Sequence, residues 1–143
     1  GRELAFTEFL SRRGLVLRSD LLGVWSGWLT PIFEPRRYRT WFFVAELPEG
    51  QVTRDVSTES SEVTWLAPLE AVEAVEEQEM FMLPPTYLTC LEVAQHATLD
   101  SLMADADGRT VEMFMPEVTA DGEEFVLSRP ERYDALLATR PLP

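Results

Sequence analysis

The chain has 143 residues, of which 45% are hydrophobic and 26% are charged, so it is long enough for one core of ordinary size and we expect a single domain over residues 1–143. Its net charge is −13, from 25 acidic and 12 basic residues, and this balance disfavours nucleic acid as a partner because a polyanion would be repelled. No apolar run approaches the roughly 20 residues that span a bilayer, so we expect no membrane insertion and a cytoplasmic location.

The first half of the chain predicts a helix followed by two strands. Residues 2–13 carry apolar side chains at helical spacing, and Gly14 is suited to end a helix. Residues 24–30 and 40–47 are rich in β-branched and aromatic side chains, which favours strands, and the proline-containing residues 31–39 connect them. The result is a strand pair with a basic connection.

The second strand contains an unbroken aromatic and β-branched run at residues 41–45. Such a run is typical of a strand covered on both faces, so we expect Trp41 in the core, together with Trp65 further along. Planar guanidiniums placed before this strand can hold a diphosphate or a carboxylate by two-point contacts. Three of the twelve basic residues stand there: Arg36, Arg37 and Arg39.

The second half of the chain predicts mainly helices and then a hairpin. Prolines that open a helix, followed by apolar positions at helical spacing, indicate most of the helices. Turn residues between short apolar runs indicate the hairpin. The expected elements are a turn at 48–51, a short strand at 63–66, helices at 68–78, from 84 onward and at 99–106, a hairpin of 110–118 with 124–127, and a short helix at 132–137.

Several motifs occur in a fairly specific order and spacing. They are Trp28-Leu29-Thr30-Pro31, Pro35-Arg36-Arg37-Tyr38, the strand from Thr40 to Ala45, Leu47-Pro48-Glu49-Gly50-Gln51, Glu59-Ser60 with Trp65 and Pro68, and Leu83-Pro84-Pro85-Thr86. With these motifs, the chain from about Phe6 to Leu91 resembles the later part of Nudix hydrolases of the actinobacterial and the mitochondrial or peroxisomal type. This subgroup includes coenzyme A diphosphatases.

The resemblance implies an α+β fold, a Nudix-type mixed β-sheet flanked by helices as an αβα sandwich, incomplete in this chain. It also implies a parent protein that uses Mg²⁺ or Mn²⁺ to cleave a diphosphate bond in a nucleoside diphosphate linked to another group, with coenzyme A or its esters favoured. The signature G-x5-E-x7-R-E-U-x-E-E-x-G-U of the family, in which U is aliphatic, cannot be placed in this chain. Arg2-Glu3-Leu4 matches its R-E-U, but Phe6 and Thr7 stand where metal-binding glutamates are required.

We therefore expect the signature in a missing segment, removed, cleaved or supplied by another chain. This chain then supplies substrate recognition and is catalytically incomplete alone. In the family, a loop glutamate before a strand tryptophan often adds a metal ligand or a general base. Glu59 and Glu62 precede Trp65 in that arrangement, so they are the catalytic candidates, with Glu59 the candidate for the metal. The alternative is that both are solvated loop acids.

Substrate binding is assigned to residues around the basic connection. The matching family motif suggests that Arg36 and Arg37 clamp a substrate phosphate, whereas the alternative is a structural pairing with Glu34 or another acid. Tyr38 and Trp28 can stack on a base or line the pocket, and the alternative for such large aromatic residues is the core.

The chain has one cysteine and one histidine, which exclude an internal disulfide and a zinc site of several His or Cys ligands. We expect Cys90 to be a buried thiol and His96 to lie on the solvated surface.

Two rival functions remain, a non-catalytic nucleotide-binding module and a protein-interaction domain. An incomplete sheet would leave an open strand edge, so a homodimer or pairing with the missing segment is a further expectation.

Overall fold

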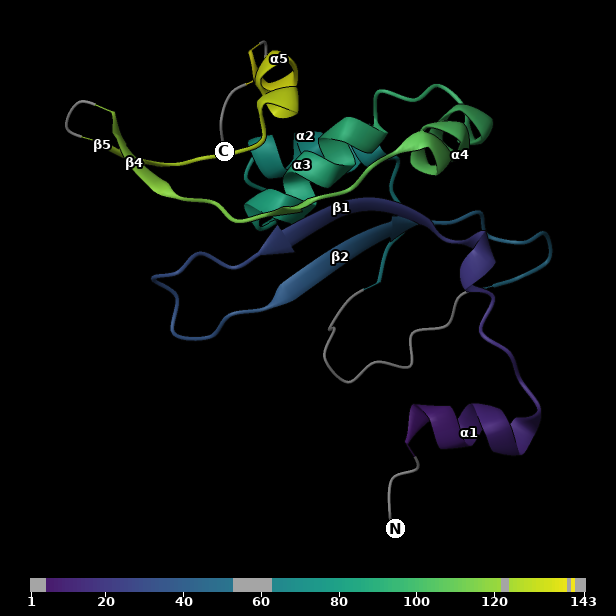
Figure 1. Ribbon diagram of the computed structural model, residues 1–143. Coiled ribbons are helices and arrows are strands. Elements are labelled where there is room, and N and C mark those ends of the chain that lie inside the picture. The colour runs from purple at the N-terminus through teal and green to yellow at the C-terminus, as the bar shows by residue number, and fades with distance from the viewer. Residues whose placement is uncertain (1–4, 53–62, 122–123, 139, 141–143) are drawn as a thin grey trace.

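The computed structural model describes residues 5–52, 63–121, 124–138 and 140. Their central feature is a three-stranded sheet of β1 (Gly23–Leu29), β2 (Arg39–Val44) and β3 (Met113–Phe114), in the order β2-β1-β3 (Figure 1). β1 pairs antiparallel with β2 and parallel with β3, so the sheet is mixed. The predicted α+β class with a mixed sheet is confirmed.

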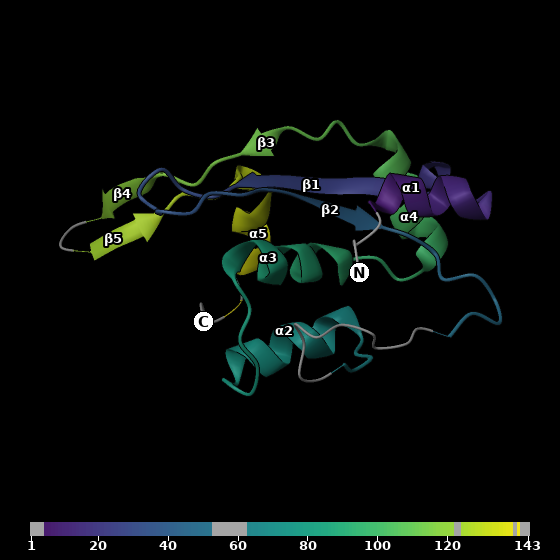
Figure 2. The ribbon, with the colours of Figure 1, turned by 90° about the horizontal axis from the view of Figure 1, so that it is seen from below.

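Two helices that begin with proline lie on one side of this sheet. They are α2 (Pro68–Glu76) and α3 (Pro84–Val93), and in Figures 1 and 2 α3 runs along the sheet with α2 packed against it. Proline suits the first turn of a helix because its φ is already helical and its missing N–H would have no partner there. Local signals thus fix where both helices start, as the sequence predicts.

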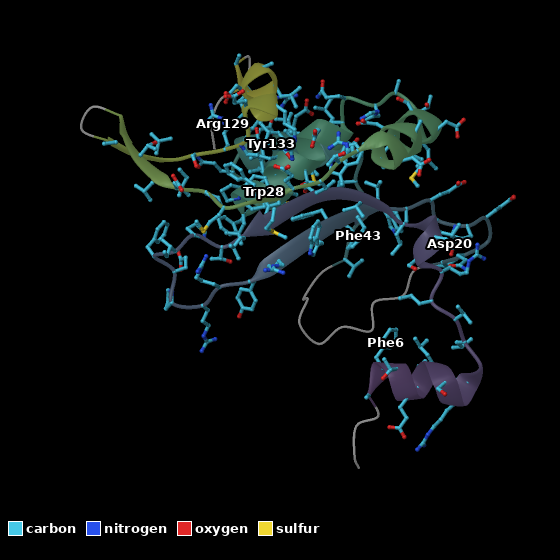
Figure 3. All side chains as sticks on the ribbon, in the orientation of Figure 1. Phe6, Asp20, Trp28, Phe43, Arg129 and Tyr133 are labelled. Carbon is cyan, nitrogen blue, oxygen red and sulfur yellow. The ribbon has the colours of Figure 1, made fainter. Side chains whose placement is uncertain are left out.

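The core fills the space between these helices and the sheet. Figure 3 shows Trp28 and Tyr133 in this space. Apolar burial of this kind contributes about 1.5–3 kcal/mol for each large side chain. The buried residues in contact are Trp28, Val72, Val75, Tyr87, Leu88, Leu91, Tyr133 and Leu137.

A β-bulge in β1 turns two consecutive side chains toward the helices. Val24 pairs with Phe43 and Ser26 pairs with Phe42, so Trp25 is an extra residue in the ladder. Trp25 and Ser26 are both almost fully buried, although neighbours in a regular strand point to opposite faces. The bulge therefore allows a strand with one covered face to bury both residues.

The first residue of β1 also lets a helix approach closely. α4 (Leu99–Gly108) packs on the start of β1, and a Cβ added to Gly23 would lie 2.6 Å from the Cβ of Ala106. Because real Cβ atoms do not approach so closely, only glycine fits this position without a shift of the helix.

The face of the sheet opposite α2 and α3 is open within the described residues. Trp41 and Phe43 are 43% and 52% exposed, while Phe42, between them, packs against the core. The prediction that residues 41–45 are covered on both faces is wrong, and so is the core prediction for Trp41. Trp65 is 72% exposed, and residues 63–66 do not form the predicted strand. A strand needs a pairing partner, and the described residues offer none to this segment.

The ends of the chain form smaller elements. α1 (Phe6–Arg13) ends at Gly14, whose φ of 61° closes the helix as predicted, and it lies apart from the helices that cover the sheet (Figure 1). β4 (Val118–Asp121) and β5 (Glu124–Leu127) form a hairpin, and its second strand is the predicted one. The first strand predicted at 110–118 is wrong, because β4 begins only at Val118 and β3, which lies within that range, joins β1 instead. The remaining elements are the 3-10 helices η1 (Ser19–Leu21) and η2 (Glu131–Tyr133) and the helix α5 (Asp134–Leu137). No helix within the described ranges has the length and apolar character to cross a bilayer.

Candidate functional site

The connection between β1 and β2 is a loop closed by Thr30 and Tyr38. The Thr30 amide donates to the Tyr38 carbonyl at 3.0 Å, and the Tyr38 amide donates to the Thr30 hydroxyl, also at 3.0 Å. Inside the loop, the Glu34 amide donates to the Pro31 carbonyl at 3.2 Å, which makes a turn. We call residues 31–38 the arginine loop, because Arg36 and Arg37 lie in it.

Arg37 fastens the arginine loop to the rest of the sheet. Its Nε donates to the Thr30 carbonyl at 3.0 Å, and its Nη2 approaches the Met115 sulfur at 3.1 Å. Met115 follows β3 directly, so the side chain joins the end of β1 to the end of β3. The alternative pairing of Arg36 or Arg37 with Glu34 is not found, since the described residues contain no such ion pair.

The four predicted substrate-binding residues divide into an exposed and a buried set. Arg36, Arg37 and Tyr38 are exposed on the arginine loop. Trp28 is only 4% exposed and stacks on Tyr133 with ring centroids 6.2 Å apart, while its Nε1 donates to the Ser26 hydroxyl at 3.2 Å. The structure thus places Trp28 in the core, and a contact of any of the four with substrate stays a prediction.

Glu59 and Glu62 lie outside the described residues. Among the residues that are described, no group of three or more His, Cys, Asp or Glu side chains could hold a metal ion. The described part of the chain therefore does not fit a resident Mg²⁺ or Mn²⁺ on its own, and the assignment of Glu59 to a metal stays a prediction.

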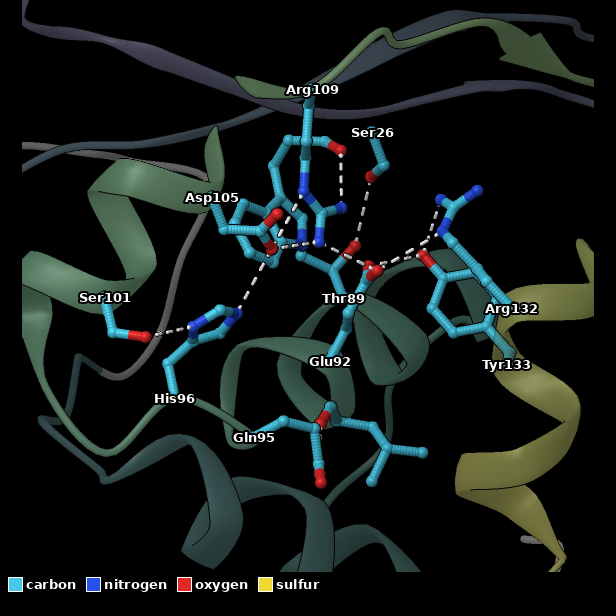
Figure 4. A network of polar contacts seen from close by, with 12 residues as sticks. Ser26, Thr89, Glu92, Gln95, His96, Ser101, Asp105, Arg109, Arg132 and Tyr133 are labelled. Atoms are coloured by element: carbon cyan, nitrogen blue, oxygen red, sulfur yellow. Dashed lines mark hydrogen bonds and ion pairs between the residues drawn. The ribbon is translucent and has the colours of Figure 1, made fainter. Parts of the chain in front are cut away.

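A buried carboxylate organises a polar network that the sequence does not predict. Glu92 of α3 is 8% exposed; it accepts hydrogen bonds from Arg109 Nη2 and from the Tyr133 hydroxyl, both at 3.0 Å (Figure 4). Arg132 Nε lies 3.3 Å from the same carboxylate. Burial and the charge of Glu92 raise the pKa of Tyr133 to about 12. A glutamate in the otherwise apolar segment of α3 is the only sequence signal for this network.

The network continues to His96 through Asp105. The Arg109 guanidinium donates to Asp105 at 2.7 Å and, by this hydrogen bond above all, lowers the pKa of that carboxyl. His96 Nε2 lies 3.3 Å from Asp105, and its ring meets the Trp25 ring edge-on with centroids 5.6 Å apart. The prediction that His96 lies on the solvated surface is therefore wrong.

The Ser101 hydroxyl completes a chain of serine, histidine and aspartate, because it lies 3.0 Å from His96 Nδ1. For Ser101 to act as a nucleophile, His96 would have to take up its proton, and the charge of Asp105 would have to stabilise the imidazolium that forms. Here Asp105 is held by Arg109, whose guanidinium also lies 3.5 Å from the centroid of the Trp25 ring. We therefore assign the chain of contacts to the attachment of α4 on β1, rather than to catalysis.

The network borders a shallow hollow of about 210 Å³. Both acidic and basic side chains line it, so it presents no surface of one charge. Its lining residues are Trp25, Glu92, Asp105, Arg109, Thr110, Val111, Glu112 and Arg132.

A separate ion pair joins the C-terminal residues to α2. Arg140 Nη1 lies 2.9 Å from Glu76, and the Tyr87 hydroxyl donates to the same carboxylate at 2.7 Å. Burial alone would raise the pKa of Glu76, but these two contacts outweigh it and the pKa lies below its usual value. Cys90, in α3, is half-buried rather than fully buried, and burial raises the pKa of its thiol.

Two curated proteins are similar to most of this chain. The acyl-coenzyme A diphosphatase NUDT19 of Homo sapiens is 32% identical over 116 residues, which are 76% of this chain and 31% of that protein. The protein of the same name from Gallus gallus is 28% identical over 113 residues, 75% of this chain and 30% of the relative. The chain thus spans about a third of the length of these relatives. No family model and no solved structure gives a significant match.

These relatives confirm the resemblance to Nudix hydrolases, and the α+β fold with a mixed sheet is consistent with it. The two relatives are both named acyl-coenzyme A diphosphatase, and coenzyme A diphosphatases belong to the subgroup that the motifs of the chain indicate.

Proposed function

We propose that this chain is the substrate-recognition part of a Nudix-type hydrolase that cleaves the diphosphate bond of coenzyme A or its esters. The observation that carries the proposal is the arginine loop, which presents exposed guanidiniums at the end of β1 in a chain similar to acyl-coenzyme A diphosphatases. The diphosphate substrate is an anion, and guanidiniums are the side chains best suited to grip phosphate oxygens.

The charge distribution supports the same location. The chain carries a net charge of −13, so an anionic small molecule is repelled from most of its surface. Arg36, Arg37 and Arg39 are the exception, because they concentrate three positive charges within four residues. A substrate with several phosphates is therefore expected to approach the arginine loop first.

The parent protein, in this proposal, holds Mg²⁺ or Mn²⁺ mainly through carboxylates outside this chain. A bound metal of that kind neutralises phosphate charge and activates water. The described residues bind and orient the diphosphate and supply no hydrolytic group. Glu59 and Glu62 are proposed to add a metal ligand or a general base.

Isothermal titration calorimetry of the full chain with coenzyme A and with ADP-ribose, each with and without Mg²⁺, tests the proposal. Binding of coenzyme A with a dissociation constant that rises with salt supports recognition of phosphates by arginine. Absence of heat with both compounds under all four conditions would refute the proposal. Inorganic phosphate serves as the control for non-specific anion binding.

A second function is favoured by one specific observation, the open face of the sheet. Val24, Trp41 and Phe43 are exposed there, as expected for a surface that docks another protein segment. A pure interaction domain predicts no binding of either nucleotide. A nucleotide-binding module predicts binding without hydrolysis even when the longer parent protein is assayed.

A further inference from the structure

The two adjacent arginines of the arginine loop have different surroundings. Arg37 uses Nε and Nη2, which together form one edge of its guanidinium, on the Thr30 carbonyl and the Met115 sulfur. That edge is one of the two with which arginine grips a phosphate by parallel hydrogen bonds. The two internal contacts therefore occupy a fork that a substrate would otherwise use.

The contacts of Arg37 also decide the shape of the loop. Thr30 takes part in the closure of the loop through its amide and its hydroxyl, and Arg37 binds the carbonyl of the same residue. The Met115 contact ties this closure to a segment 78 residues away in the chain. Without Arg37, β1 and β3 would keep their parallel pairing, but the loop would lose its side-chain contact with Met115 at the end of β3.

Arg36 has the opposite character. Its side chain is exposed, and it makes no hydrogen bond or ion pair with any residue that the structure describes. Within the described residues, both edges of the Arg36 guanidinium are therefore free to donate hydrogen bonds to an anion. The backbone on its C-terminal side is held by Arg37 and by the Thr30–Tyr38 closure, so the position from which Arg36 extends is fixed.

We infer that Arg37 is a positioning residue that sets the shape of the arginine loop, and that Arg36 is the residue that contacts the phosphate groups of a coenzyme A-like ligand. This division of roles rests on the proposed function, and it narrows the two-arginine clamp to one direct contact. Lysine cannot replace Arg37, because a single ammonium does not reproduce the planar fork that spans an oxygen and a sulfur acceptor.

The variant Met115→Leu separates the two roles. It removes the sulfur acceptor of Arg37, keeps a side chain of similar size and changes no residue of the arginine loop. If Arg37 positions the loop, Met115→Leu weakens coenzyme A binding. If Arg37 instead bound phosphate directly, its release from Met115 would leave the affinity unchanged or improve it.

The experiment combines calorimetry with coenzyme A and hydrogen exchange of the Thr30 and Tyr38 amides. We expect Arg36→Ala to raise the dissociation constant about tenfold or more, the factor expected for one lost charge-assisted hydrogen bond, with unchanged exchange at both amides. Arg37→Ala and Arg37→Lys should raise the dissociation constant and also accelerate exchange. Adding Met115→Leu to Arg37→Ala should have no further effect.

Arg13→Ala is the matched control, since Arg13 is exposed like Arg36, forms no ion pair within the described residues and lies far from the loop in sequence, so its removal should change the dissociation constant less than twofold. Unchanged exchange in Arg37→Ala, or full affinity in Arg36→Ala, would overturn the inference. If the unmodified chain binds no coenzyme A, the proposed function fails and the role of Arg36 fails with it. The exchange measurements then still decide whether Arg37 holds the loop.

Discussion

Replacement of Glu92 by glutamine should destabilise the fold by an amount that the network geometry allows one to estimate. Glu92 and Arg109 have side chains that are only 11% and 17% exposed, so water screens their ion pair weakly. Loss of a hydrogen bond to a charged group costs about 1.5–3 kcal/mol, and breaking a buried pair costs about 3–5 kcal/mol. Glutamine keeps an acceptor for Tyr133, and Arg109 keeps Asp105, so we expect about 2–3 kcal/mol.

The assay is urea unfolding followed by tryptophan fluorescence, together with thermal unfolding. For a chain of this length, about 2–3 kcal/mol corresponds to a decrease in Tm of roughly 6–12 °C. Glu77→Gln is the matched control, because it removes the same charge from an exposed position at the end of α2 and should change stability by less than about 0.5 kcal/mol. A Glu92→Gln variant as stable as this control would refute the reasoning, since the network would then contribute nothing to the fold.

Four further outcomes are expected. Gly23→Ala should destabilise the chain by about 1–3 kcal/mol in urea, because its methyl group collides with α4, whereas Gly108→Ala adds its methyl group to open space and should not. The lowered pKa of Glu76 gives stability that is present above its ordinary pKa of 4.5 and is lost as pH falls through the lower folded value, so Glu76→Gln should flatten acid unfolding curves. Cys90 should react slowly with a thiol reagent at pH 8 in the native state and much faster in urea, because burial raises its pKa, and equal rates would contradict its half-buried position. Glu59→Gln should lower turnover of the longer parent protein without a change in Tm, while lost stability with intact turnover would make Glu59 structural.

The helices were predictable because their signals are local. The prolines at 68 and 84 and the glycine at 14 mark helix ends through backbone constraints that do not depend on the rest of the fold. The two long strands were likewise predictable from their β-branched and aromatic composition. These features require no knowledge of which segments meet in space.

The covering of the strands was not predictable in the same way. The run at residues 41–45 has no polar alternation, so the sequence does not show that one face of β2 is open. The bulge at Trp25 interrupts the alternation of buried and exposed side chains within β1, and no residue in the sequence indicates where it occurs. β3 pairs with β1 from far along the chain, whereas local spacing favoured a longer strand in the following hairpin.

The candidate site shows the same division. The arginine loop was predictable because prolines and arginines stand together between two strand patterns. The partners of Arg37 were not, since Met115 is remote in sequence and methionine rarely indicates a polar contact. Glu92 and Arg109 pair across 17 residues, and only the position of Glu92 among apolar neighbours distinguishes it from a solvated acid.

The bulge in β1 makes the length of this strand intolerant of change. Deleting Trp25 would remove the indole that lies against Arg109 and His96. Deleting Ser26 or Gly27 would shift the register of the strand by one residue and turn Trp28 away from Tyr133. If this part of the chain is transferred into a related protein, all seven residues of β1 should therefore be transferred together. Variation in chain length among homologues is expected to be confined to the connections on either side of it.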